Sequence, residues 1–314
     1  MDISDRLNVT STQEEIEPFL ELTPELVQKR RSQGRIIFDR FIRNRIAIVG
    51  ALCLILLFLF CFLGPLIWRI DPNAINVTSG SSSLAAPTLP HPFGTDDVGR
   101  DEVARAMAGG RVSLLIGLTS MLMAIIFGVG VGAFAGYYGG IIDNLLMRFT
   151  DVVLAVPLYL LLFVLSASFT DHTPRSVIIL IAVLTWTYAA RLVRGEFLSL
   201  KEREYVLAAR TIGARNLRMM FRHILPNAAG PIIVNATLLV GANIILESVM
   251  SYFGFGIQPP DASWGSLVSD GQGFFDVAPW LVIVPGLLIF LTVLSFNLVG
   301  DGLRDALDPY MTER

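Results

Sequence analysis

The chain contains few of the side chains on which redox centres and metal sites depend: two cysteines and three histidines in 314 residues. Cys53 and Cys61 lie eight residues apart in one apolar run. On a helix that separation is roughly 12 Å, which is too long for a disulfide. The three histidines are scattered and match no metal-site spacing. We therefore expect neither a disulfide nor a metal site.

Sequence signals for catalysis are also absent. A Walker A loop needs Gly-Lys-Ser/Thr, because its lysine reaches the nucleotide phosphates. The chain has two lysines, Lys29 after Gln28 and Lys201 after Leu200, and neither fits. No Gly-x-Ser-x-Gly elbow, catalytic carboxylate pair or Cys–His arrangement stands out. We expect a chain that is not an enzyme, has no catalytic residue and holds no cofactor of its own.

Charged residues are scarce, at 16% of the chain, against roughly 25% in ordinary soluble domains. Hydrophobic residues make up 53% of the chain. The net charge of −3 leaves no basic excess for binding nucleic acid. The composition therefore indicates a polytopic membrane protein.

Several apolar segments satisfy the requirement of roughly 20 residues for each bilayer crossing. They predict an all-α protein with six transmembrane helices, at 46–68, 112–138, 152–170, 176–193, 229–252 and 277–299. We divide the chain into an N-terminal tail with an interfacial helix (1–45), a first span with a long loop (46–111), a core domain (112–300) and a C-terminal tail (301–314).

The N-terminal region is basic as well as apolar. Thr23-Pro24-Glu25 is a helix start, with a cap, a proline at the first position and an acid near the positive end of the helix dipole. Seven basic residues follow among isoleucines and phenylalanines up to Arg45, which predicts a helix at the membrane interface. An arm that binds nucleic acid is the alternative. We expect no cleavable signal peptide, because the first apolar run starts late and is long.

Lysine and arginine are divided unevenly between the two sides of the predicted membrane. The two tails and the loops on their side hold 19 of the 24 basic residues, and the opposite loops hold 5. Cytoplasmic loops of membrane proteins carry such an excess. We therefore expect both termini and the polar segment 194–227 to be cytoplasmic.

That polar segment has a helical pattern between residues 204 and 227. Four apolar residues fall at i, i+3, i+4 and i+7 and are predicted to line one helix face: Leu217, Met220, Phe221 and Ile224. Gly213 allows a turn between two short helices, and Pro226 either ends the second helix or starts the next. The pattern predicts a helical elbow outside the bilayer. An ordinary amphipathic surface loop is the alternative.

Glycine recurs at every fourth position of the second predicted span and just after it, at Gly128, Gly132, Gly136 and Gly140. This spacing lets two helices approach closely within lipid. Packing between two spans of this chain is the preferred interpretation, and contact with another subunit is the alternative.

The long loop before that span ends in an acidic stretch, residues 91–101. Its spacing misses the EF-hand pattern, so we do not expect calcium. We expect Thr95 or Asp96 to cap a helix that runs into Val112. In the later loop on the same side, Trp264 suits either a partner contact or plain anchoring at the membrane interface.

Glu247 is the only acidic residue in the fifth predicted span. A charged carboxylate is costly near mid-membrane, so it tends to face protein or water. Asn235 and Asn243 precede it by twelve and four residues, on roughly one helix face. With Ser248, this stripe is predicted to line a pathway or gate between two subunits. A structural role, with Glu247 protonated or hydrogen-bonded to a neighbouring span, is the alternative.

The polar segment carries a recognisable motif, made of Tyr205-Val206, Ala208-Ala209, Gly213 and His223-Ile224-Leu225-Pro226-Asn227. These residues and their spacing resemble the EAA loop of ABC importer permeases. The fuller pattern is similar to the branch that imports dipeptides, oligopeptides and nickel. Leu207 stands where the general motif has glutamate, a departure typical of that branch.

Further matches extend this resemblance over nearly the whole chain, from about Arg35 to Pro309. They are Thr95-Asp96 with Gly99-Arg100-Asp101, then Asp143, Met147-Arg148, Asp151 and Pro157, then residues 245–260, and finally Gly300-Asp301-Gly302-Leu303-Arg304-Asp305. The chain is thus identified as a C-type permease subunit of this branch.

The resemblance implies a type I (MetI-like) ABC permease fold. It implies a subunit that forms half of a translocation pathway for di- or oligopeptides in the bacterial plasma membrane. The implied partners are a homologous permease in a heterodimer, two cytoplasmic ABC ATPase subunits that bind ATP and magnesium, an extracytoplasmic solute-binding protein and membrane lipid. No nucleic acid is implied.

The resemblance also implies roles for individual residues. Coupling to the ATPases falls to the residues of the polar segment: Tyr205, Ala208, Ala209, Arg210, Gly213, Ala214, Arg215 and Arg218. Contact with the binding protein falls to residues of the two opposite loops: Asp96, Arg100, Asp101, Gln258 and Trp264.

Two other classes of protein would also have six spans. A channel or secondary transporter would place several ionisable groups at mid-membrane, where Glu247 is nearly alone. A structural scaffold would leave residues 191–227 without a role. Within the family, nickel chelates and glutathione are alternative cargoes, because these solutes share the scaffold.

Overall fold

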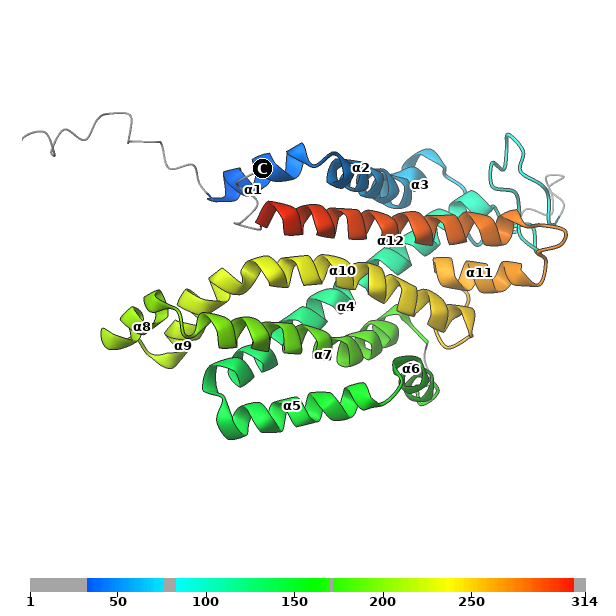
Figure 1. The fold of residues 1–314 in the computed structure, drawn as a ribbon. Helices are drawn as coiled ribbons and strands as arrows, with labels where there is room; N and C mark the ends of the chain where they lie inside the picture. The colour runs from blue at the N-terminus through cyan, green and yellow to red at the C-terminus, as the bar shows by residue number, and fades with distance from the viewer. Residues whose placement is uncertain (1–32, 76–82, 170–171, 308–314) are drawn as a thin grey trace, which may run out of the picture.

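The computed structural model describes residues 33–75, 83–169 and 172–307, and its regular elements are helices (Figure 1). The expected all-α fold is therefore confirmed. The predicted helix start at Thr23 lies outside the described residues. In chain order the elements are α1 (Gln33–Arg43), α2 (Arg45–Phe58), the π-helix η3 (Leu59–Leu63), α3 (Gly64–Ile67), α4 (Glu102–Tyr138), α5 (Gly140–Ala155), α6 (Leu158–Ser166), α7 (Pro174–Leu200), α8 (Glu204–Thr211), α9 (Asn216–Arg218), the π-helix η4 (Met219–Ile224), α10 (Leu225–Tyr252), α11 (Trp264–Gln272) and α12 (Trp280–Leu307).

Five helical stretches in the described residues are long and apolar enough to cross a membrane: Arg45–Ile67, Glu102–Tyr138, Pro174–Leu200, Asn216–Tyr252 and Trp280–Leu307. The bent pair of α5 and α6 makes a sixth crossing if it counts as one span. In Figure 1, α1, α8 and α9 lie at one end of the bundle and α6 and α11 at the other. We call these the loop end and the far end.

The third predicted span, 152–170, is not one straight helix. α5 ends at Ala155 and α6 begins at Leu158, and the two helices are bent by 83°. Pro157 has no backbone N–H to continue the helix, and its ring forces the preceding Val156 into an extended conformation. The apolar run concealed this break, because hydropathy does not register a proline bend.

α4 begins at Glu102, ten residues before the predicted start of its span. Its N-cap is Asp101, whose side chain accepts a hydrogen bond from the Ala104 N–H at 2.8 Å. The expectation that Thr95 or Asp96 caps this helix was wrong. Thr95 instead forms an isolated antiparallel bridge with Asp101, and Asp96 closes the turn between them. The first turns of α4 contain charged residues, so the apolar run used to predict the span begins later in the sequence than the helix itself.

Glycines bring α4 and α7 close together. A Cβ added at Gly132 would lie 2.4 Å from the carbonyl oxygen of Ala190, and one at Gly136 would lie 2.6 Å from the Cβ of Phe197. Such distances are too short for any real side chain. The predicted glycine repeat thus packs two helices of one chain. Gly140 lies beyond the contact, in the turn that leads into α5.

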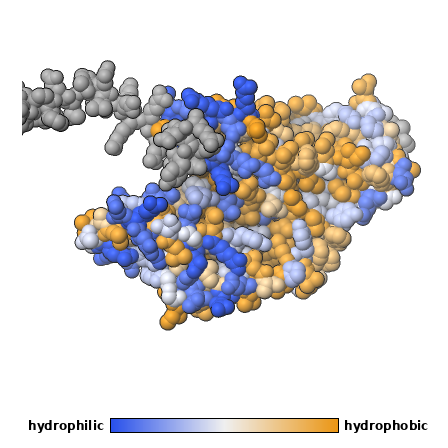
Figure 2. Space-filling view, viewed as in Figure 1, coloured by the Kyte–Doolittle hydropathy of each residue, from blue (hydrophilic) through white to orange (hydrophobic). Residues whose placement is uncertain are grey.

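Buried apolar residues form three clusters along the bundle. One lies at the loop end around Phe197, a second lies around Ile181 between α4, α6, α7 and α10, and a third surrounds Trp264 towards the far end. Apolar side chains also cover the outside of the bundle (Figure 2). Leu52 on α2, Leu145 on α5 and Leu287 on α12 are examples. Hydrophilic residues gather over the loop end, as expected where a membrane protein meets water.

Gly132→Ala is expected to destabilise the protein, because the added methyl group meets backbone atoms of α7 that cannot move aside. The loss should be about 1–3 kcal/mol in the free energy of unfolding, visible as a lower melting temperature in detergent. Gly130→Ala is the matched control, since a Cβ at this position of the same helix meets nothing within 4 Å. Equal melting temperatures for the two variants would contradict the packing argument.

Candidate functional site

The polar segment forms a helical elbow at the loop end. α7 ends at Leu200, α8 follows after a short turn, and α9 with η4 leads into α10. Gly213 makes the turn between the two short helices with a positive φ of 83°, a conformation that other residues adopt only with strain. Pro226 lies in the first turn of α10. Of the two predictions for this proline, that it ends the second short helix or starts the next helix, the second is correct.

The buried face of the elbow differs from the prediction. Met219, Met220 and Ile224 are fully buried, whereas Leu217 and Phe221 are exposed. The physical reason is the π-helix η4, in which hydrogen bonds join residues five apart instead of four. This wider turn shifts the side chains away from the 3.6-residue period on which the prediction relied.

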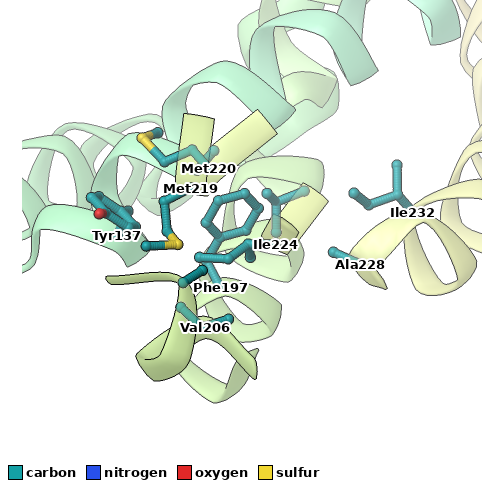
Figure 3. Close-up of a cluster of buried hydrophobic side chains, with 11 residues drawn as sticks. Tyr137, Phe197, Val206, Met219, Met220, Ile224, Ala228 and Ile232 are labelled. Atoms are coloured by element: carbon teal, nitrogen blue, oxygen red, sulfur yellow. The ribbon is translucent and has the colours of Figure 1, made fainter. Parts of the chain in front are cut away.

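The buried side chains of the elbow belong to the cluster at the loop end (Figure 3). Val206 of α8 and Met219, Met220 and Ile224 of η4 are fully buried in this cluster. The other side of the cluster comes from the long helices and includes Tyr137 of α4 and Phe197 of α7. Burial of large apolar side chains is the main source of stability at such a contact. The elbow is therefore seated on α4 and α7.

Two hydrogen bonds add to this attachment. The Tyr137 hydroxyl donates to the Asn216 side-chain oxygen at 2.9 Å, which joins the end of α4 to the start of α9. The Lys201 ammonium donates to the carbonyl oxygen of Gly136 at 3.2 Å. Both bonds reach the end of α4, so the elbow and this helix end form one packed unit.

The surface of the elbow combines apolar and basic side chains. Ile212 is 86% exposed at the tip, beside Gly213. We define the loop surface as the exposed apolar residues Tyr205, Leu207, Ile212, Leu217 and Phe221 together with Arg203, Arg210, Arg215, Arg218 and Arg222. Partial burial raises the pKa of the Tyr205 phenol, and the nearby Arg203 opposes this shift. Exposed apolar side chains among charged ones are typical of a surface that contacts another protein.

Six of the eight residues assigned to ATPase coupling are exposed on the elbow: Tyr205, Ala208, Arg210, Gly213, Arg215 and Arg218. Ala214 is partly buried. Ala209 is buried in the cluster, so its side chain cannot contact a partner directly and serves the seating of α8. The motif did not identify Ile212, Leu217 and Phe221. Their apolar character within a basic segment could have indicated a contact surface. The predicted helix face, however, assigned Leu217 and Phe221 to the buried side of the elbow.

At the far end, the carboxylate of Asp101 organises the loop before α4. It accepts hydrogen bonds from the Trp68 indole N–H at 2.9 Å and from the Ala104 N–H at 2.8 Å, and it lies 2.7 Å from His91 Nδ1. Asp101 is fully buried, which corrects its predicted role as a contact for a binding protein. Its position makes it a structural residue of the loop.

A second charged network joins this loop to α11. Arg105 is 5% exposed and forms ion pairs with Asp96 and with Asp270 of α11, at 3.6 and 3.1 Å. Arg100 bonds Asp96 at 2.6 Å. Burial raises the pKa of the Asp270 carboxyl, and the Arg105 guanidinium opposes this shift.

Of the residues predicted to contact a binding protein, only Gln258 is exposed. Arg100 is partly exposed and Asp96 is mostly buried. Trp264 is fully buried, and its indole N–H donates to the carbonyl oxygen of Ala106 at 2.9 Å. Neither predicted role of Trp264 fits this burial, because a tryptophan that anchors at an interface or binds a partner must reach the surface.

Glu247 lies inside the protein and is fully buried. One carboxylate oxygen accepts a hydrogen bond from the Ser113 hydroxyl of α4 at 2.9 Å, and the other accepts from the Ser251 hydroxyl at 2.8 Å. Ser113 also accepts a hydrogen bond from the Trp264 backbone N–H. The carboxylate therefore links α4, α10 and the start of α11.

The rest of the predicted polar stripe is also turned inward. Asn243 is fully buried and donates to the Ser120 hydroxyl of α4 at 2.8 Å. Ser248 is 9% exposed, and Asn235 is partly buried. Of the two predictions for this stripe, a pathway or a structural role, these hydrogen bonds to α4 fit the structural role for Asn243 and Glu247 and not the pathway.

Comparison with protein families identifies this arrangement. A family model described as the inner membrane component of binding-protein-dependent transport systems matches residues 128–313, which include the elbow. A second family model, described as the N-terminal transmembrane domain of oligopeptide transport permease C, matches residues 32–87. Both agree with the resemblance found in the sequence.

Individual relatives cover almost the whole chain. The oligopeptide transport system permease protein OppC of Bacillus subtilis is 40% identical over 270 residues, 86% of this chain and 87% of the relative. The dipeptide transport system permease protein DppC of Alkalihalophilus pseudofirmus is 41% identical over 89% of this chain and 91% of its own length. OppC of Escherichia coli K12 is 37% identical over 90% of this chain and 94% of its own length. This chain therefore belongs to the family of inner membrane components of binding-protein-dependent transport systems.

Proposed function

We propose that this chain is a transmembrane permease subunit of an ABC importer and forms half of its translocation pathway. The observation that carries the proposal is the loop surface, an exposed apolar and basic patch seated on a buried cluster. A partner that binds this surface would push directly on α4 and α7. The sequence motif for ATPase coupling lies on the same elbow, so we assign the surface to an ABC ATPase subunit.

We propose the other partners on the ground of the family resemblance. A homologous permease completes the pathway, two cytoplasmic ATPase subunits bind ATP and magnesium, and an extracytoplasmic binding protein delivers the solute. We place the chain in the bacterial plasma membrane with both termini and the elbow in the cytoplasm, which agrees with the excess of basic residues on that side. The far end then faces the binding protein, with the exposed Gln258 and the partly exposed Arg100 as candidates for contact.

We propose di- or oligopeptides as the cargo. The relatives at about 40% identity are named as oligopeptide and dipeptide permeases. Nickel chelates and glutathione, a channel and a secondary transporter gain no support from these relatives. The buried Glu247 also argues against an ion-coupled carrier, because such a carrier needs a titrating group that its ion can reach.

The mechanism is transmission of a movement through packed elements. ATP binding would close the two ATPases and displace the loop surface. Because Val206 and Met219 share a buried cluster with Phe197, the displacement passes to α7, and because glycines press α4 against α7, both helices move together. The exposed arginines fix the elbow on its partner, and the apolar residues supply the contact area.

Charge reversal at Arg215 should weaken the bond to the ATPase. We expect Arg215→Glu to cost about 1 kcal/mol at low salt, roughly fivefold in affinity, measured by co-purification of the ATPase with the permease. The difference should shrink as salt screens the charges. Arg69→Glu, an exposed arginine near the far end, is the control. If Arg215→Glu retained its ATPase at low salt as well as this control does, arginine docking would be excluded.

A β-branched residue in the elbow turn should uncouple hydrolysis from uptake. Gly213→Val must place a valine at φ 83°, which strains the turn and reorients the loop surface, although the space around the Cβ is open. We expect assembled complexes that hydrolyse ATP with uptake reduced about tenfold. Gly195→Val, at an open helical position of α7, controls for the bulk of the side chain. Normal uptake in Gly213→Val would show that the turn geometry is unimportant.

We assign Glu247 a structural role, since its carboxylate bonds Ser113 and Ser251 inside the chain. Glu247→Leu leaves both hydroxyls without this acceptor, and each lost partner should cost about 1–3 kcal/mol of stability. Glu247→Gln keeps one acceptor oxygen and should cost less. Melting temperature and uptake per assembled complex are the measurements. A stable Glu247→Gln complex that fails to transport would contradict the structural role and support a place for Glu247 in the translocation pathway.

A further inference from the structure

Helix α5 is attached to the bundle by few buried contacts. Thr150 is its one buried residue, and its outer side exposes large apolar residues such as Leu145 and Val152. Both of its ends are joints. Gly139 before it and Gly140, its first residue, have positive φ values of 66° and 55°, and the bend at Pro157 follows it. A helix with so little packing and a joint at each end needs specific contacts to hold its position.

The polar contacts of this kind are ion pairs with α7, beside one ring contact between Phe149 and Trp186. The Arg194 guanidinium bonds both carboxylate oxygens of Asp143, at 2.5 and 2.6 Å. Arg191, almost one turn earlier in α7, bonds Asp151 at 2.6 Å. A two-point guanidinium–carboxylate pair fixes orientation as well as distance. Asp143 makes such a two-point pair, and Asp151, eight residues later on α5, adds a single bond between exposed side chains, so the two contacts together set the position and the direction of this helix against α7.

The same turns of α7 seat the elbow. Val193 and Phe197 are fully buried in the cluster beneath α8 and η4, while Arg191 and Arg194, which lie among them in the sequence, point to α5. One short segment of α7 thus holds the elbow with its apolar side chains and α5 with its basic ones. A displacement of this segment must act on both.

The other end of the α5–α6 pair touches the loop before α11. The Ser166 hydroxyl at the end of α6 donates to the carbonyl oxygen of Phe255 at 2.6 Å. The ring of Phe163 lies 5.1 Å from the ring of Phe255. Figure 1 shows α5 running along the bundle from the loop end and α6 at the far end. The bent pair is therefore a continuous connection between the two ends of the molecule.

We propose that Asp143 and Arg194, supported by Asp151 and Arg191, are the positioning residues through which α5 and α6 follow the elbow and carry its displacement to the loop at Phe255. The proposal rests on the proposed function, since it requires a partner that moves the elbow. It assigns to the ion pairs the main part of this task, because α5 buries a single side chain and its apolar packing is limited to partly buried or exposed side chains such as Val153 and Phe149, whose ring stacks on Trp186.

The test is a charge exchange in the complete transporter, reconstituted with its ATPases, partner permease and binding protein in liposomes. Asp143→Arg places two positive charges together and should lower peptide uptake per ATP hydrolysed about tenfold. Asp143→Asn, which keeps the shape of the side chain, should give a smaller loss in the same direction. The exchanged pair, Asp143→Arg with Arg194→Asp, should recover uptake to within about threefold of the wild type. Arg148→Glu changes a charge on an exposed face of the same helix and should leave the ratio unchanged.

A distance between two spin labels, followed through the ATP cycle, distinguishes a positioning role of the ion pair from a merely structural one. Labels at Leu145 and Tyr188, both exposed, report the separation of α5 from α7 in a background without Cys53 and Cys61. We expect the distance to stay constant through the ATP cycle in the otherwise unmodified protein and to change in Asp143→Arg. Unchanged uptake per ATP hydrolysed in Asp143→Arg, or an exchanged pair no better than the single variant, would overturn the proposal. Loss of the ATPase from the wild-type complex would refute the proposed function instead.

Discussion

Helices α4 and α7 approach each other more closely than ordinary side chains permit, and the rest of the structure is arranged around that contact. Lipid tails are as apolar as leucine, so no hydrophobic force drives two spans together in a bilayer, and close van der Waals contact has to hold them. Glycine at 128, 132 and 136 makes that contact possible. The cluster around Phe197 extends it beyond the glycines and provides the seat for α8 and η4. The elbow is thus an extension of the tightest contact in the bundle.

The long helices could be predicted from the sequence because their signal is local and repeated. Any run of some 20 apolar residues has one stable state in a bilayer, the helix, since every backbone group must be bonded within the segment. Features set by one residue were missed. Pro157 bends the third span inside an apolar run, and Asp101 caps α4 ten residues before that run begins. Both depend on the bonding of a single backbone group, to which hydropathy is blind.

Residue roles were harder to predict than residue positions. The motif placed the elbow and its turn correctly, because Gly213 has a local conformational reason to be glycine. Trp264 was expected at a surface, and Glu247 either at a pathway or in a structural role bonded to a neighbouring span. Both are buried because partners on another helix, α4, satisfy them: the carbonyl oxygen of Ala106 for the indole, and the Ser113 hydroxyl for the carboxylate, which also bonds Ser251 of its own helix. Such partners are far away in the sequence, so one chain read alone cannot reveal them.

The π-helix η4 stands between the elbow and the membrane-spanning part of α10. In a regular α-helix each residue turns the chain by about 100°, and a π-turn accommodates one residue more than an α-turn would. Removing one residue from Met219–Ile224 would let the helix become regular and would keep the arginines at 215 and 218 in nearly the same direction relative to α10. The same deletion in a regular helix would rotate everything before it by about 100°. The π-turn is therefore the place where this span can lose a residue without reorienting the cytoplasmic surface relative to the membrane helix.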